Sequence, residues 1–174
     1  METKTITLPK TVSQVFEYSL IASSFLIPFL ISGPQLLTGT IVNSLFYLFV
    51  LQSVSKKILP IVLLPSIGAL LNGIIFGKFT VFLLYFLPMI WISNYLLIHS
   101  FKFFLKKKSP VLISMGISAL LKTLLLFSIA YLFTTIKIVP QIFLQLMGLF
   151  QLYTALLGGV IALGIHFLIS KKNG

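Results

Sequence analysis

Six long runs of apolar residues divide this sequence, and they constrain its fold more than any other feature. An α-helix needs about 20 apolar residues to cross the hydrocarbon core of a bilayer, because each residue advances the helix by only about 1.5 Å. Inside the bilayer every backbone N–H and C=O must find a partner within the protein, and a helix satisfies them internally. The runs therefore predict an all-α integral membrane protein, folded as a six-transmembrane-helix bundle.

The expected helices follow from the residues that interrupt the runs. The pair Gly33 and Pro34 is a turn signal after the first run, and Lys56 and Lys57 close the second. A short amphipathic piece is expected around residues 139–146. The sequence thus predicts one transmembrane domain, residues 1–174, with helices over approximately residues 15–31, 36–52, 58–76, 79–101, 111–133 and 147–169.

Composition excludes two other fold classes. Hydrophobic residues make up 58% of the chain, charged residues only 9%, and the mean hydropathy is +1.12, so a water-soluble domain is excluded. A transmembrane β-barrel is excluded because its strands alternate apolar and polar residues, whereas these runs are apolar on all sides. A cleaved signal peptide is the competing interpretation of the first run. We favour a retained helix, because no A-x-A-like site follows it and Glu17 lies near its start.

The lysines predict the orientation of the bundle. The net charge of +11 arises from 13 lysines, two glutamates and no arginine, and the lysines gather at the ends of the runs, which argues for membrane topology rather than nucleic-acid binding. With the N-terminus inside, the outer loops hold two, Lys78 and Lys137. Ten then fall on the cytoplasmic side: Lys4, Lys10, Lys56, Lys57, Lys102, Lys106, Lys107, Lys108, Lys171 and Lys172. This bias predicts a multi-pass protein of the cell membrane with both termini cytoplasmic.

The thirteenth lysine, Lys122, lies inside the fifth run, in the stretch "SALLKTLLLF". It stands 11 residues into a predicted span of about 23, which places it near the bilayer midplane. An ammonium at that depth costs roughly 2.5 to 3.5 kcal/mol, so it should face the bundle and have a partner. No carboxylate is expected at this depth. Three interpretations stay open: structural satisfaction by amides, carbonyls or water, contact with an anionic or carbonyl-bearing ligand, and a proton relay.

Other polar residues gather mainly in the predicted outer half of the bundle. Gln35 and Thr38 begin the second helix, with Asn43 two turns deeper, whereas Asn94 lies in the inner part of the fourth. The candidate substrate-binding residues are Lys122, Asn43, Gln35, Thr38, Asn72, Gln151, Thr154 and Asn94.

Groups for catalysis and metal binding are scarce. The chain has no cysteine and no aspartate, so thiolate chemistry, a carboxylate pair in the membrane and a serine triad with aspartate are excluded. The two histidines, His99 and His166, fall near predicted cytoplasmic helix ends, and two histidines without carboxylate or thiolate support make a poor metal site. We therefore predict no enzymatic activity, no cofactor and no bound metal.

Small residues spaced four apart indicate how the helices pack, because they let backbones approach closely in lipid. The third helix carries Ala69, Gly73 and Gly77, and the sixth carries the pairs Ala155 with Gly159 and Gly158 with Ala162. Trp91 and several tyrosines are expected to be interfacial anchors.

Five stretches carry a resemblance to a known family: "SGPQLLTGTIVNSLFYL", "LLPSIGALLNG", "LPMIWISNYLL", "SALLKTLLLF" and "FQLYTALLGGVIAL". They resemble a family of small bacterial membrane proteins similar to the S-component, the substrate-binding subunit, of energy-coupling-factor (ECF) transporters. The resemblance covers about residues 20–168. Relatives are sometimes labelled "iron hydrogenase", a function that a chain without cysteine does not support. The family's recurring polar and glycine positions correspond here to Gln35, Thr38, Gly39, Asn43, Asn94, Lys122, Gln151 and Thr154.

The resemblance implies a subunit that captures a micronutrient outside the cell and associates with a transmembrane coupling protein and two ATPases. Two departures are present: the first helix lacks the A-x-x-x-A docking stripe of several S-components, and "METKT" lacks the Met-His element of the nickel and cobalt types. We expect a membrane-embedded solute-binding subunit for a small organic ligand that bears an anionic or carbonyl group. The alternative is a non-transporting structural or assembly protein, in which the polar residues only stabilise helix packing.

Overall fold

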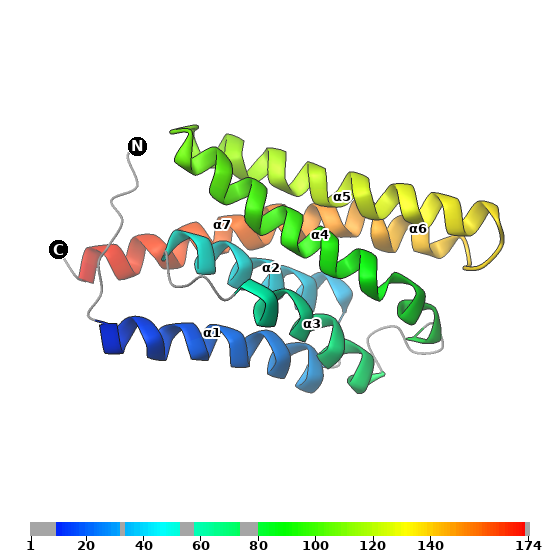
Figure 1. Ribbon diagram of the computed structural model, residues 1–174, viewed down its shortest axis with the longest axis horizontal. Helices are drawn as coiled ribbons and strands as arrows, with labels where there is room; N and C mark the ends of the chain where they lie inside the picture. Colours follow the sequence, from blue (N-terminus) through cyan, green and yellow to red (C-terminus); the bar gives the residue numbers. More distant parts are fainter. Residues whose placement is uncertain (1–9, 32–33, 53–57, 74–79, 173–174) are drawn as a thin grey trace.

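The computed structural model describes residues 10–31, 34–52, 58–73 and 80–172. Within these residues the chain is helical and contains no strand, and its helices form an elongated bundle (Figure 1). The helices are α1 (Lys10–Leu30), α2 (Gln35–Leu51), α3 (Ile58–Asn72), α4 (Thr80–Lys106), α5 (Val111–Thr135), α6 (Ile142–Met147) and α7 (Leu149–Lys172).

The architecture is that expected of an all-α membrane protein. Three helical stretches are long and apolar enough to cross a membrane, namely Thr80–Lys106, Val111–Thr135 and Ile142–Lys171, the last of which covers α6 and all of α7 except its final residue. Three further helical stretches are apolar but shorter: Gln14–Leu30, Gln35–Leu51 and Ile58–Asn72. The fold class predicted from the apolar runs is therefore confirmed at the level of a helical, membrane-type bundle.

Several helix ends differ from the prediction, including the start of α1 at Lys10 instead of residue 15, and two of the differences have identifiable reasons. We expected the third helix to reach residue 76, but α3 ends at Asn72, where Gly73 adopts the left-handed conformation, φ 68°, that terminates helices. The fourth was expected to stop at residue 101, but α4 continues to Lys106. Lysine favours helices, so the helix extends beyond the apolar run before Lys108, at φ 59°, ends it.

The helices associate most extensively in three pairs, α1 with α3, α2 with α7, and α4 with α5. Glycine allows close approach in two of them. A Cβ added at Gly158 in α7 would lie 2.7 Å from the carbonyl oxygen of Thr40 in α2, and one added at Gly68 in α3 would lie 2.5 Å from that of Phe25 in α1.

The small-residue prediction therefore holds for α7 and needs correction for α3. Ala155 and Ala162 of α7 are completely buried, as close packing requires. In α3 a Cβ at Gly73 would meet nothing within 4 Å, so this glycine ends the helix instead of packing it, and Gly68 makes the close contact. Gly77 lies outside the described residues.

The two ends of the bundle differ in charge. The first residue of α1 and the last residue of α7 lie at the same end, together with the end of α4 (Figure 1). That end carries the lysines at the end of α4 and of α7, whereas Lys137 follows α5 at the opposite end.

Large apolar side chains cover the outside of the bundle. Leu112 of α5 is 68% exposed, Leu168 of α7 67% and Leu59 of α3 66%, and many others exceed one third. A soluble protein rarely exposes so much contiguous apolar surface, whereas a bilayer solvates it favourably.

Candidate functional site

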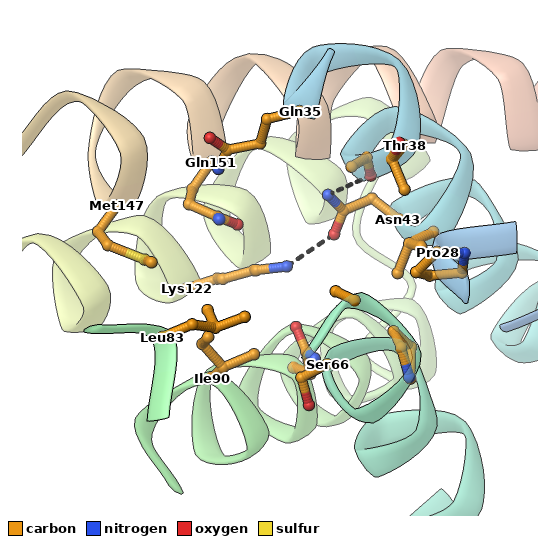
Figure 2. A pocket seen from close by; sticks show the side chains of 15 residues that line it. Pro28, Gln35, Thr38, Asn43, Ser66, Leu83, Ile90, Lys122, Met147 and Gln151 are labelled. Carbon is orange, nitrogen blue, oxygen red and sulfur yellow. Dashed lines mark hydrogen bonds between the residues drawn. The ribbon is translucent and has the colours of Figure 1, made fainter. Parts of the chain in front are cut away.

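A partly open cavity of about 100 Å³ lies between the helices of the bundle, and each of the seven helices contributes to its lining (Figure 2). It lies where the three helix pairs meet. The lining residues are Pro28, Gln35, Thr38, Gly39, Val42, Asn43, Pro65, Ser66, Ala69, Leu83, Ile90, Asn94, Lys122, Met147 and Gln151.

Lys122 reaches this cavity from the middle of α5, eleven residues after the helix begins at Val111 and thirteen before it ends at Thr135. Its side chain is buried, with 3% of its surface exposed. Nζ donates a hydrogen bond of 2.8 Å to Oδ1 of Asn43, and it lies 5.5 Å from the centroid of the Phe46 ring. An amide oxygen and an aromatic face therefore take the place of a carboxylate.

Asn43 connects the lysine to a second helix. Its Nδ2 donates to the carbonyl oxygen of Gly39 at 2.9 Å and to Oγ1 of Thr154 at 3.1 Å. Thr154 in turn donates to the carbonyl oxygen of Gln151 at 3.1 Å. The amide is therefore fully oriented, because its nitrogen is used by α2 and α7 and its oxygen must face Lys122.

Two polar atoms of α2 in this region lack a hydrogen-bond partner among the described residues. Thr38 is 4% exposed and its Oγ1 has no partner, and Oε1 of Gln35 is likewise buried and unpaired, although its Nε2 donates to the carbonyl oxygen of Leu146 at 3.1 Å. Both residues line the cavity. Buried polar atoms without partners are uncommon, because each one lowers the free energy of unfolding. These two atoms are therefore candidate hydrogen-bond partners for a ligand.

The lining divides into walls of different character. We call Gln35, Thr38, Asn43, Lys122 and Gln151, from α2, α5 and α7, the polar wall. We call Pro28, Pro65 and Ala69, from α1 and α3, the proline wall. Figure 2 shows the amides of Gln35, Gln151 and Asn43 to one side of Lys122, with Leu83 and Ile90 of α4 to the other.

The fourth helix joins the cavity to α3 through two hydrogen bonds. Nδ2 of Asn94 donates to the carbonyl oxygen of Val62 at 3.2 Å, and Nε1 of Trp91 donates to Oγ of Ser66 at 2.7 Å. Trp91 lies near the middle of α4 and contacts a lining residue, so it is not the interfacial anchor that we expected.

The structure brings most of the predicted site residues together. Six of the eight line the cavity: Gln35, Thr38, Asn43, Asn94, Lys122 and Gln151. Thr154 lies behind Asn43 as a hydrogen-bonding support. Asn72 lies elsewhere, at the end of α3, where its Nδ2 donates to the carbonyl oxygen of Phe29 at 2.7 Å and ties α3 to α1.

Sequence reasoning missed several lining residues. Ser66 and Met147 carried no signal of depth or direction, because serine and methionine are ordinary in membrane helices. Pro28 and Pro65 did carry a signal, since a proline inside an apolar run marks a place where backbone carbonyl groups are freed and need partners within the bundle.

A second polar pair lies toward the lysine-rich end. Nε2 of Gln52 and Nδ1 of His166 are 3.3 Å apart, and both side chains are buried. Among the described residues no three histidine, cysteine, aspartate or glutamate side chains are placed to hold a metal ion.

Comparisons with protein-family models, curated proteins and solved structures give no match to this chain.

Proposed function

We propose that this protein is a membrane-embedded solute-binding subunit for uptake, and that the cavity around Lys122 holds the solute. The observation that carries the proposal is the juxtaposition of a buried lysine with two unpaired polar atoms at one cavity. A polar residue that only holds helices together normally makes all its hydrogen bonds to neighbouring residues. A ligand-binding residue keeps a free donor or acceptor for its ligand.

The proposed arrangement in the membrane is six crossings with both termini in the cytoplasm. Support comes from the lysines, which concentrate at the end of the bundle where α1 begins and α7 ends. In this orientation Gln35 and α6 lie toward the outside, so a solute enters the cavity from the outer face. The proposed location is the cell membrane.

The proposed partners are a transmembrane coupling protein and ATPase subunits of the ECF type. This part rests on the resemblance of the five sequence stretches to an S-component-like family. The chain contains no Gly-rich phosphate-binding loop, so energy for uptake has to come from a gradient or another subunit.

The test is to identify what the purified chain carries. We expect mass spectrometry to detect a small organic molecule that is released from the wild type and depleted in Lys122→Met. The matched control is Lys106→Met, at the exposed end of α4, which should retain the molecule. Adding the identified molecule at about 100 times its Kd should stabilise the wild type by about 2.7 kcal/mol in thermal unfolding. Equal content in all three proteins, with no stabilisation, would refute the proposal.

A structural or assembly role is the second candidate, and one observation favours it. The hydrogen bond from Lys122 to Asn43 shows that the protein itself supplies part of the lysine's requirement. Under this alternative, Lys122→Met keeps or raises the thermal midpoint and leaves every uptake phenotype of the cell intact.

A further inference from the structure

We infer that the solute is a short-chain hydroxy-monocarboxylate of about two to three carbons, with its carboxylate at Lys122 and its hydroxyl at Gln35. This inference rests on the proposed function and specifies the chemical class of its ligand.

The volume of the cavity sets the size of the solute. An apolar cavity of about 150 Å³ accommodates benzene, which has six non-hydrogen atoms, so the cavity of about 100 Å³ here accommodates about four to six. Pockets for drug-sized ligands and cofactors have volumes of about 300 to 1,000 Å³. The solute is therefore much smaller than a vitamin.

The charge of the solute follows from the groups that face it. Lys122 is the one charged side chain among the lining residues, and its single hydrogen-bond partner in the described part of the chain is a neutral amide. One monovalent anion neutralises this ammonium, whereas a dianion, a cation or a zwitterion leaves uncompensated charge in a site of low dielectric constant. A carboxylate also accepts a hydrogen bond from the unpaired hydroxyl of Thr38.

The hydroxyl group of the solute is inferred from the side chain of Gln35. Its Oε1 is a hydrogen-bond acceptor without a partner, while its Nε2 is already used by the carbonyl oxygen of Leu146. A plain carboxylate has no donor to offer this oxygen, and a halide has none either. An alcohol group on the solute supplies one, and Leu83 and Ile90 opposite the amides contact its carbon atoms.

The protein contains its own reporter for binding. Trp91 is the single tryptophan of the chain, and its indole N–H donates to Ser66, which lines the cavity. A solute that enters the cavity changes the surroundings of this hydrogen bond, so the tryptophan emission should report saturation.

The experiment titrates purified protein in detergent at constant ionic strength with glycolate and lactate. The comparison compounds are acetate, which lacks the hydroxyl, glycolamide, which lacks the charge, and glycine, which is a zwitterion. We expect saturable emission changes with glycolate and lactate, about tenfold weaker affinity for acetate, and no saturation with glycolamide or glycine.

The decisive variant is Asn43→Asp, which gives Lys122 a carboxylate partner inside the protein. It should weaken glycolate binding at least tenfold while the protein stays folded, because the ammonium is then neutralised internally. Asn72→Asp makes the same substitution outside the cavity and should bind glycolate as the wild type does.

The remaining outcomes separate this inference from the proposed function. Glycolamide or glycine binding as tightly as glycolate overturns the assignment of charge, and acetate binding equally overturns the assignment of the hydroxyl. Saturation by a larger co-purified molecule, with none by glycolate or lactate, overturns the inference and leaves the solute-binding function standing. If neither these acids nor any cell-extract fraction changes the emission or the thermal midpoint, both proposals are wrong.

Discussion

The polar wall and the proline wall of the cavity are held together by different means. Behind the polar wall, α2 and α7 meet at Gly158, and a chain of hydrogen bonds runs from Lys122 through Asn43 to Thr154. Behind the proline wall, α1 and α3 meet at Gly68, and the wall itself presents Pro28, Pro65 and Ala69. The comparison teaches that the polar wall presents the hydrogen-bonding groups of the cavity, whereas the proline wall presents apolar side chains; under the proposed function, the first would select the solute and the second would limit its size.

The largest effect is expected from breaking the backbone contact behind the polar wall. In Gly158→Ala the new Cβ would lie 2.7 Å from the carbonyl oxygen of Thr40 and 2.8 Å from the amide nitrogen of Ser44, so α2 and α7 must separate. We expect a loss of about 1 to 3 kcal/mol in the free energy of unfolding, together with loss of solute binding. The control in the same helix is Gly164→Ala, whose Cβ meets nothing within 4 Å. Thermal unfolding in detergent measures both, and equal midpoints would contradict the close contact.

The next effect distinguishes two buried threonines of the same region. Thr154→Val removes the hydroxyl that accepts from Asn43 and donates to Gln151, so we expect a loss of about 1 to 2 kcal/mol in stability. Thr38→Val removes a buried hydroxyl without a described partner, so the free energy of unfolding should stay the same or rise, by up to about 1 to 3 kcal/mol. Thr38→Val should nevertheless weaken glycolate binding in the tryptophan titration. The reverse order of stabilities would show that Thr38, not Thr154, is the structural hydroxyl.

A third prediction tests the proline wall. Ala69→Leu adds three carbon atoms to the edge of a cavity of about 100 Å³. We expect solute binding to fall at least tenfold while the free energy of unfolding stays within about 1 kcal/mol of the wild type, because the added atoms fill space. Leu71→Ala, at an exposed position two residues further along α3, is the control for general damage to this helix. Wild-type affinity in Ala69→Leu would mean that the solute does not reach α3.

The smallest effect is expected at the link between α3 and α4. Ser66→Ala removes the acceptor of the Trp91 indole N–H. It should lower the free energy of unfolding by no more than about 1.5 kcal/mol. The emission spectrum of the single tryptophan should shift even without solute, whereas Ser109→Ala, beyond the end of α4, should leave it unchanged. An unshifted spectrum in Ser66→Ala would show that this hydrogen bond does not persist in solution.

The fold and part of the site were predictable from the sequence for one physical reason, which is that depth along a helix can be counted. Lys122 was placed at mid-helix by counting residues, and Gln35 and Thr38 were placed at the start of the second helix with Asn43 two turns deeper. The sequence predicted only the chemical type of the hydrogen-bond partner of Lys122, such as an amide or a carbonyl. The structure identifies this partner as Asn43.

What counting did not provide is helix rotation, which is set by packing against neighbours. Asn72 has a similar depth to other candidates, yet its place at the end of α3 turns it toward Phe29 of α1. Trp91 faces Ser66 for the same reason, although tryptophan alone suggests an interface. Gly73 ends α3, but its spacing from Ala69 also fitted a helix-packing motif. The sequence alone could not distinguish a glycine that ends a helix from one that packs against a neighbour.

The break between α6 and α7 has a consequence for the cavity. Gly148 separates the two helices, and a Cβ there would lie 2.5 Å from the carbonyl oxygen of Leu144, so no other residue fits without a shift. The short helix that precedes it supplies Met147 to the cavity and is tied to the first residue of α2 by the bond from Gln35 to Leu146. If the cavity holds a solute, as we propose, the position of Met147 beside it depends on a glycine that is not itself a lining residue.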